Sequence, residues 1–326
     1  MTISLIQYRA ADGTRGVAVI RDGGTPSVVP GATSTVVLAR RAIAEGTTLA
    51  ALVAAAGQGE PLDLATVTLL APIEHEDPAH LLLTGTGLTH LGSAEGRDKM
   101  HRAASEAATQ TDSMKMFLMG VEGGKPASGP GVQPEWFYKG DGSQLIAPGA
   151  PLPSPAFALD AGEEPEIAGI YLIGDDGTPF RLGIALANEF SDHVTERGNY
   201  LWLAHSKLRP AALGPELLLG DLPAHVEGTS RILRDGEALW EKPFVSGEAN
   251  MSHSLANLEH HHFKYALFRR PGDLHVHFFG TATLSFSDEV RTQEGDVFEI
   301  SAAPFTLPVR NPIVHAADAP VTVRVL

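Results

Sequence analysis

Short apolar runs separated by glycine and proline dominate the chain and predict a protein built mainly from β-strands. The first seventy residues have their own pattern. Strand-like runs at residues 3–9, 15–20 and 26–30 precede two segments, 34–45 and 47–56, in which Ala and Leu recur at helical spacing. This order predicts a small N-terminal α/β domain over residues 1–72, closed by a short acidic stretch between Pro72 and Pro78.

Residues 73–326 are predicted to form a second, larger domain. Strand-like runs lie at residues 81–84, 167–173, 181–187, 225–234, 274–279, 297–300 and 321–326. The main helix is expected at 253–268, with partial helix in 92–119. Strands and helices do not alternate regularly, which argues against a doubly wound or α/β-barrel architecture. The predicted fold class is therefore α+β, predominantly β.

Composition and charge exclude several classes of partner and of metal site. The chain has 326 residues and a formal net charge of −15, which disfavours nucleic acid and anionic membranes as partners. With no cysteine, any metal must be held by oxygen or imidazole. No apolar run reaches the length of about 20 residues needed to span a bilayer. We expect a soluble, cytoplasmic protein whose anionic substrate is met by a metal or by local lysines and arginines.

Two glutamates mark the start of a very apolar strand. Glu164 and Glu166 precede the run 167–173, and side chains two apart in a strand share a face. Two carboxylates on one face repel each other unless a cation or a proton lies between them. The alternative is that Glu163, Glu164 and Glu166 are all solvated at an exposed strand end.

Further carboxylates follow the next strand. Glu189 follows the run 181–187 after Asn188, and Asp192 lies three residues later. Three carboxylates suit a hard divalent ion, Mg²⁺ most of all, with Mn²⁺ or Ca²⁺ as alternatives, and zinc is disfavoured.

An ordered series of short motifs resembles the core of the fumarylacetoacetate hydrolase superfamily. These are Phe137-Tyr138-Lys139, Gly149 with Leu152-Pro153, Glu164-Pro165-Glu166-Ile167-Ala168 with Ile173-Gly174, Asn188-Glu189-Phe190-Ser191, Lys207 and Gly214-Pro215. Downstream, Pro271-Gly272-Asp273, Phe279-Gly280-Thr281, Glu294-Gly295-Asp296-Val297 and Arg310-Asn311-Pro312-Ile313 follow in the family's order. The likeness covers about residues 81–315. It implies a mixed β-roll catalytic domain beside the small N-terminal domain.

The resemblance also implies a ligand set. It assigns metal binding to Glu164, Glu166 and Glu189, although Glu189 stands where the family usually has Asp. Asp192 and His193 replace the family's usual Ala-Arg. Because the longer Glu189 side chain would shift the ion, Asp192 remains an alternative third ligand.

A histidine ends the run that begins at Leu81. In the family, a similar strand delivers a general-base histidine, which makes His90 the candidate base, since imidazole changes charge near neutral pH. The alternative is a histidine that caps a following helix. Hydrolytic members often carry Glu three residues later, where this chain has Ser93, and the nearest acid is Glu95.

The remaining candidates contact the substrate. Lys139 and Lys207 match the family's two lysines, and a lysine beside an enolate can stabilise negative charge or move a proton. Lys207 is the catalytic candidate and Lys139 a substrate-binding one. Gly280 and Thr281 are expected to bind the substrate carboxylate, unless they form a simple turn after a strand. The run 259–262, Glu-His-His-His, is interpreted as a packed or solvated helix, because consecutive helical residues point in different directions.

The resemblance finally indicates the reaction. Family members activate a small 2-oxo acid by chelating it to a metal and forming an enolate at C3. Residues 87–101 and 188–193 resemble the sugar-acid branch, which predicts a lyase that dehydrates a 2-keto-3-deoxy-pentonate. One alternative is a C–C hydrolase of acylpyruvates or other 2,4-dioxo acids. Another is a non-catalytic sugar-acid-binding protein. The family also suggests a homodimer.

Overall fold

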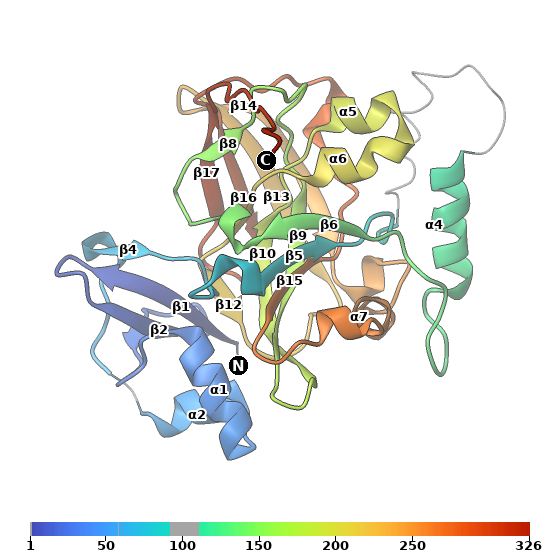
Figure 1. Cartoon of the computed structure of the whole chain (residues 1–326). Coiled ribbons are helices and arrows are strands. Elements are labelled where there is room, and N and C mark those ends of the chain that lie inside the picture. The colour runs from blue at the N-terminus through green and yellow to red at the C-terminus, as the bar shows by residue number, and fades with distance from the viewer. Residues whose placement is uncertain (1, 58, 92–110) are drawn as a thin grey trace.

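The computed structural model describes residues 2–57, 59–91 and 111–326 and contains two β-sheets (Figure 1). A 12-stranded mixed sheet has the order β3-β2-β1-β12-β10-β9-β15-β5-β6 along its main path, and a 5-stranded sheet has the order β14-β13-β16-β17-β8. With few helices among the described residues, the predicted α+β, predominantly β class is confirmed.

The N-terminal unit begins the large sheet. Its elements are β1 (Ile3–Ala10), β2 (Arg15–Arg21), β3 (Ser27–Val28), α1 (Thr35–Glu45), α2 (Leu49–Ala55) and β4 (Val67–Leu69). Ser34 and Thr48 start the two helices as N-caps, because each side chain accepts a backbone N–H that the first turn leaves free. β1 pairs with β2 on one side and with β12 (Glu216–Leu218) on the other, so the sheet runs on into the rest of the chain. A boundary at residue 72 stays a prediction.

The centre of the large sheet is buried on both faces. Its strands are β5 (Leu81–Gly85), β6 (Phe137–Asp141), β7 (Leu145–Ile146), β9 (Pro165–Ile173), β10 (Pro179–Asn188), β11 (Ala211–Leu213) and β15 (Leu274–Phe278). Along β9, Ala168, Ile170 and Leu172 pack into one apolar cluster, whereas Ile167 packs into another. Burial on both faces explains why this strand is a continuous apolar run.

The smaller sheet covers one face of the larger one. It contains β8 (Leu152–Ser154), β13 (Val226–Arg234), β14 (Glu237–Ser246), β16 (Val297–Ala302) and β17 (Val309–His315). Ile232 and Ile300 of this sheet share an apolar cluster with Ile184 and Leu186 of β10. The two sheets therefore form a sandwich around this second cluster.

Four more helices are described after the N-terminal unit. They are α4 (Asp112–Gly123), α5 (His193–Gly198), α6 (Leu203–Lys207) and α7 (Leu255–Phe263), and α7 is followed by a 3₁₀ turn at Ala266–Phe268. The predicted helix at 253–268 is thus shorter and broken. The run 259–262 belongs to α7. Of the partial helix predicted for 92–119, only the last residues are described, and they begin α4.

One predicted strand is wrong. Residues 321–326 form no strand, and the side chains of Val321, Val323 and Val325 are 89%, 87% and 96% exposed. Their alternation has the composition of a strand, yet the chain offers no partner edge, and β-propensity acts only through such neighbours. No helix among the described residues is long and apolar enough to cross a membrane.

Three buried histidines lie between α7 and the large sheet. The ring of His262 stacks on that of His277 at 4.5 Å between centroids and meets the ring of His275 edge-on at 5.0 Å. Thr84 Oγ1 lies 2.8 Å from His277 Nδ1. Burial lowers the pKa of His275 to about 4 and that of His277 to about 3. The folded protein therefore keeps both rings neutral at pH values where the unfolded chain would protonate them.

We expect this histidine cluster to make stability depend on pH. Below an unfolded pKa of about 6.5 the unfolded chain binds more protons than the folded one, so the free energy of unfolding falls as pH decreases towards the folded pKa values. Each of His275 and His277 should lower the free energy of unfolding by roughly 2 kcal/mol as the pH falls from 6.5 to 5. Urea unfolding at a series of pH values measures this slope. His277→Leu should make the slope shallower, whereas His225→Leu, at an exposed site, should leave it unchanged; an unaltered slope in the first variant would contradict the account.

Candidate active site

The candidate residues meet at one edge of the large sheet. β9 begins there, and its antiparallel neighbours β10 and β15 end there. β5 runs parallel to β15 and ends at the same edge, and β6, antiparallel to β5, begins there. Figure 1 shows these strands side by side in the middle of the molecule. Loops that are distant in sequence are thereby brought to one place.

Strand register brings three glutamates together. Asn188 pairs with Pro165, and the next residues along, Glu189 and Glu164, are joined by a 3.0 Å hydrogen bond from the backbone N–H of Glu189 to the carbonyl of Glu164. Glu166 lies two residues further along β9, on the same face. One carboxylate oxygen from each of the three glutamates lies within 4.8 Å of the others, and all three residues are buried. The interpretation of these glutamates as solvated is therefore wrong.

Lys207, the last residue of α6, reaches into the carboxylate cluster. Its Nζ contacts Glu164 Oε1, lies 2.5 Å from Glu189 Oε2 and donates to Ser191 Oγ at 3.1 Å. It also lies 5.0 Å from the centre of the Phe137 ring. Only 1% of this lysine is exposed, and it forms part of the wall of a small cavity beside the glutamates.

Lys139 lies behind the cluster and does not line the cavity, and its contact with substrate stays a prediction. The side chain is fully buried on β6 and is not among the residues that line the cavity. Its Nζ lies 2.5 Å from Glu189 Oε1 and donates to the carbonyl oxygens of Phe190 and Lys207. Burial, reinforced by the nearby Lys207 charge, lowers the pKa of Lys139. Its contacts are those of a counter-ion that holds Glu189 in place.

A buried histidine, which our sequence analysis did not include among the site residues, supports Glu164 from the other side. His193 begins α5, and its Nε2 lies 3.0 Å from Glu164 Oε1 while its Nδ1 lies 3.2 Å from Asp160 Oδ2. Burial opposes the charged ring, but hydrogen bonds to these two carboxylates outweigh it and raise the pKa of His193 to about 10. The imidazolium therefore binds two carboxylates at once. The departure from the resembled motif at residues 192–193 was the sequence signal that could have identified His193.

Charges within the cluster shift the pKa values of Glu164 and Glu166 in opposite directions. Burial alone would raise the pKa of Glu164, yet Lys207 and His193 hold it well below its usual range. The pKa of Glu166 is raised well above its usual range by burial and by the charges of Glu189 and Glu164. Buried negative charge on this face is thus only partly compensated by the protein's own cations.

The carboxylate of Asp192 is bound elsewhere and does not join the three converging glutamates. Its carboxylate caps α5 by accepting from the backbone N–H of Thr195 at 2.9 Å, accepts from that of Leu159 at 2.9 Å and pairs with Arg209 at 2.8 Å. It is absent from the group of converging carboxylates, which contains Glu189. The alternative of Asp192 as ligand is therefore not supported.

His90 lies near the site without lining the cavity. It is fully buried, with Nε2 3.0 Å from Ser246 Oγ and Nδ1 3.2 Å from Thr89 Oγ1. Burial lowers its pKa to about 4, so the ring is neutral. Its role as a base stays a prediction, and Ser93 and Glu95 lie outside the described residues.

The cavity beside the glutamates is small, about 20 Å³, which is room for about one water molecule. Its walls come from the end of β5, the start of β6, α6 and the loop after β15: Thr86, Gly87, Leu88, Phe137, Glu164, Glu166, Lys207, Gly280, Thr281, Ala282 and Leu284. Gly280 donates its backbone N–H to Glu166 Oε2 at 2.7 Å. Its φ of 93° and the lack of space for a Cβ, which would lie 2.3 Å from Thr89 Oγ1, both require glycine here. Gly280 and Thr281 thus line the cavity, and their binding of the substrate carboxylate stays a prediction.

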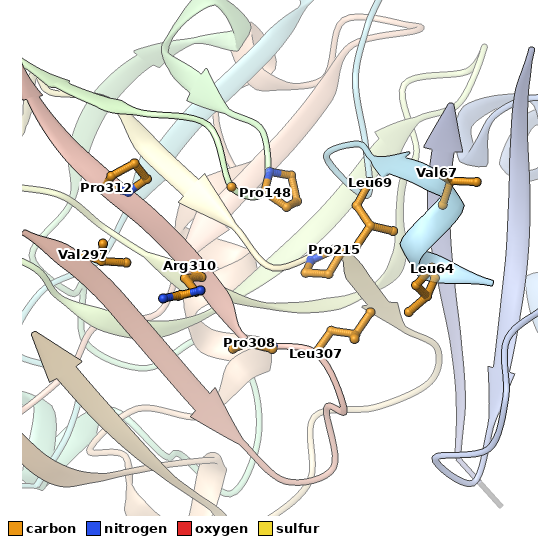
Figure 2. Close-up of a pocket in the computed structure, with 11 residues that line it drawn as sticks. Leu64, Val67, Leu69, Pro148, Pro215, Val297, Leu307, Pro308, Arg310 and Pro312 are labelled. Carbon is orange, nitrogen blue, oxygen red and sulfur yellow. The ribbon is translucent and has the colours of Figure 1, made fainter. Parts of the chain in front are cut away.

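A larger cavity of about 540 Å³ lies elsewhere, between the N-terminal unit and β17 (Figure 2). Its walls are mainly leucine, valine and proline, including Leu69, Pro215 and Pro312, and Arg310 is the one charged residue among those that the structure describes there. Among the described residues that line it, none is an acid or base that could transfer a proton near neutral pH. Another cavity, lined by Trp136 and Phe268 among others, is larger still at about 620 Å³. Size therefore does not identify the site, because the three converging carboxylates lie at the small cavity.

The donor set fits a hard divalent cation. Three buried carboxylates supply oxygen alone, which suits Mg²⁺ better than zinc. Two of them, Glu164 and Glu189, are already bound to a lysine ammonium, which indicates that cations are favoured between these oxygens. The chain can therefore hold a divalent metal at Glu164, Glu166 and Glu189.

Solved structures share the fold over nearly the whole chain. The apo form of 2-keto-3-deoxy-D-arabinonate dehydratase matches with a TM-score of 0.70 and 17% sequence identity, covering 97% of this chain and all of that one. A complex of 2-keto-3-deoxy-D-arabinonate dehydratase with magnesium and 2,5-dioxopentanoate matches with a TM-score of 0.69, at the same identity and coverage. 5-Carboxymethyl-2-hydroxymuconate delta-isomerase from Mycobacterium smegmatis matches with a TM-score of 0.58 and 18% identity, covering 97% and 100% of the two chains.

No family model and no curated protein matches the sequence. The resemblance to the fumarylacetoacetate hydrolase superfamily, nearest its sugar-acid branch, is confirmed by these structural matches as a likeness of fold. At such low sequence identity, these matches show that the fold is shared and do not show the activity of this chain.

Proposed function

We propose that this chain is a metal-dependent lyase that dehydrates a 2-keto-3-deoxy sugar acid, a pentonate by preference. The observation that carries the proposal is the convergence of Glu164, Glu166 and Glu189 beside Lys207, a proton-carrying group on the wall of the same cavity. Two structures that share the fold are named as a sugar-acid dehydratase, and one of them contains magnesium. This likeness favours dehydration over other enolate chemistry.

Glu164, Glu166 and Glu189 would hold the metal, Mg²⁺ by preference. When bound, the cation would polarise the 2-oxo group of the substrate and stabilise the negative charge that develops as C3 loses its proton. Lys139 and His193 keep Glu189 and Glu164 in place through their ion pairs. Thr281 lines the cavity and is suited to bind the substrate carboxylate.

Lys207 is the proposed acid. Its ammonium group carries the proton that the 4-hydroxyl needs in order to leave as water, when the C4–O bond breaks after C3 is deprotonated. The buried site excludes bulk water, which protects the enolate from being quenched by stray protons. His90 remains the predicted base for C3, and its closeness to Gly280 is consistent with a position near the substrate: a Cβ on Gly280 would lie 3.5 Å from His90 Nδ1.

Product analysis tests the proposal. The purified chain is incubated with MgCl₂ and 2-keto-3-deoxy-D-arabinonate, and the products are separated by chromatography. Loss of water across C3–C4 leaves a 2-oxo-3-ene, which becomes a 2,5-dioxo acid when a proton moves from C5 to C3 and the resulting C4–C5 enol tautomerises to the aldehyde. We therefore expect a 2,5-dioxo acid, with one water lost, and none when EDTA replaces MgCl₂. Release of pyruvate from a 2,4-dioxo acid, with no dehydration of the pentonate, would overturn the lyase in favour of a C–C hydrolase.

The same experiment also tests a non-catalytic alternative. Binding of the pentonate in the presence of metal, with no product from either substrate, would favour a sugar-acid-binding protein.

We also propose that the protein is a homodimer and that it is soluble and cytoplasmic. Sedimentation velocity would test the oligomer, because a single species at the mass of one 34.5 kDa chain would contradict it.

A further inference from the structure

The loop after β15, residues 280–285, forms one wall of the cavity through Thr281, Ala282 and Leu284. Its first residue is held by Glu166, which accepts the backbone N–H of Gly280. Its last residue is held by Glu163: the backbone N–H of Ser285 donates to Glu163 Oε1 at 2.8 Å, and Ser285 Oγ donates to Oε2 at 2.6 Å. Two glutamates from the same short segment thus hold the two ends of the loop.

We propose that Glu163 is a positioning residue that fixes this loop and so determines how tightly the site binds its 2-oxo acid. It does so without contacting the metal, because it is not one of the converging carboxylates. The identity of the bound acid rests on the proposed function. The attachment of the loop does not.

Burial and side-chain direction support a dedicated role for Glu163. It is fully buried, and Ser285 is 2% exposed. A buried carboxylate is costly unless both oxygens are hydrogen-bonded, and here the backbone and side chain of one residue satisfy both. Glu164, the next residue, points instead to Lys207 and His193. Adjacent side chains therefore serve the loop and the metal cluster separately.

The two ends of the loop are held in different ways. At Gly280 the backbone itself is confined, because an added Cβ would lie 2.3 Å from Thr89 Oγ1 and 2.9 Å from the carbonyl of Thr86. At Ser285 the attachment is a pair of hydrogen bonds to one carboxyl group. The second end is thus the one that a single side-chain change can release. A released loop must be ordered again on binding, which weakens affinity.

Hydrogen exchange and kinetics of Glu163→Ala, compared with Glu163→Gln, test this inference. Glutamine can still accept the Ser285 N–H and donate to its hydroxyl, whereas alanine can do neither. In Glu163→Ala we expect amide exchange of residues 281–285 to be at least about tenfold faster, since both hydrogen bonds that hold Ser285 are lost. KM for 2-keto-3-deoxy-D-arabinonate should rise about tenfold, with Mn²⁺ affinity within about twofold of the wild type. Glu163→Gln should restore exchange and KM to within about threefold.

Two outcomes would overturn the inference. One is unchanged exchange of residues 281–285 in Glu163→Ala. The other is a loss of Mn²⁺ affinity as large as the change in KM, which would mean that Glu163 acts through the metal. Ser285→Ala, which removes only one hydrogen bond, should give an intermediate exchange rate even if Glu163→Ala fails to fold. Exchange and Mn²⁺ binding need no turnover, so they remain decisive if the wild type does not dehydrate the pentonate.

Discussion

Replacing Glu164 and Glu166 together with glutamine is expected to abolish divalent-metal binding and to lower dehydration at least about 10³-fold. The physical reason is the loss of two of three charged oxygen ligands, and with them a metal contribution worth several kcal/mol in the transition state. Isothermal titration with Mn²⁺ and product formation with 2-keto-3-deoxy-D-arabinonate measure the two effects.

Folding must be separated from metal binding in this variant. Glutamine has the shape of glutamate and removes negative charge from a crowded buried cluster, so thermal unfolding should remain cooperative. Glu227→Gln, at an exposed position, is the matched control and should leave both measurements unchanged. Undiminished activity and unchanged metal content in the double variant would remove the basis of the proposed site.

Lys207→Met is expected to lower kcat by about 10³-fold while metal binding is kept or strengthened. Methionine fills a similar volume but carries no proton for the departing hydroxyl. Removing a cation that contacts Glu164 and Glu189 also leaves these carboxylates freer to bind Mg²⁺. The two effects have opposite signs, and a general loss of structure would not produce both.

Chemical rescue sharpens this second experiment. In Lys207→Ala, added methylamine should recover part of the lost kcat, because a small ammonium ion can occupy the space left by the side chain. A parallel loss of kcat and Mn²⁺ affinity in Lys207→Met, with no rescue by amines, would show that the lysine only supports the carboxylates.

Much of the fold could be predicted from the sequence where a segment is buried on both faces. β9 is a continuous apolar run, and its predicted span differs from the observed one by two residues. Segments whose structure depends on distant partners were harder to predict. β14 was missed because most of its side chains are exposed, so its pattern shows little alternation of apolar residues. The false strand at 321–326 is the converse case, in which composition favours a strand that has no neighbour.

In the candidate site, too, local features could be predicted from the sequence, but contacts between distant elements could not. The spacing of Glu164 and Glu166 is local, so a shared face could be predicted from strand geometry. The partners that surround them come from distant elements. Sequence spacing could not show that Lys139 lies behind Glu189 instead of at the cavity. Nor could it show that His193 bridges Asp160 and Glu164, because these contacts depend on how α5 packs against the start of β9.

Glu164, Glu166 and Glu189 together are expected to hold one divalent ion. The most direct test is a crystal structure of the protein grown or soaked with MnCl₂, with data collected for the anomalous signal of manganese. We expect one strong anomalous peak bound by a carboxylate oxygen from each of the three glutamates. A map with no peak among these side chains, or with a peak bound only by Asp192 and its neighbours, would contradict a metal site at these glutamates.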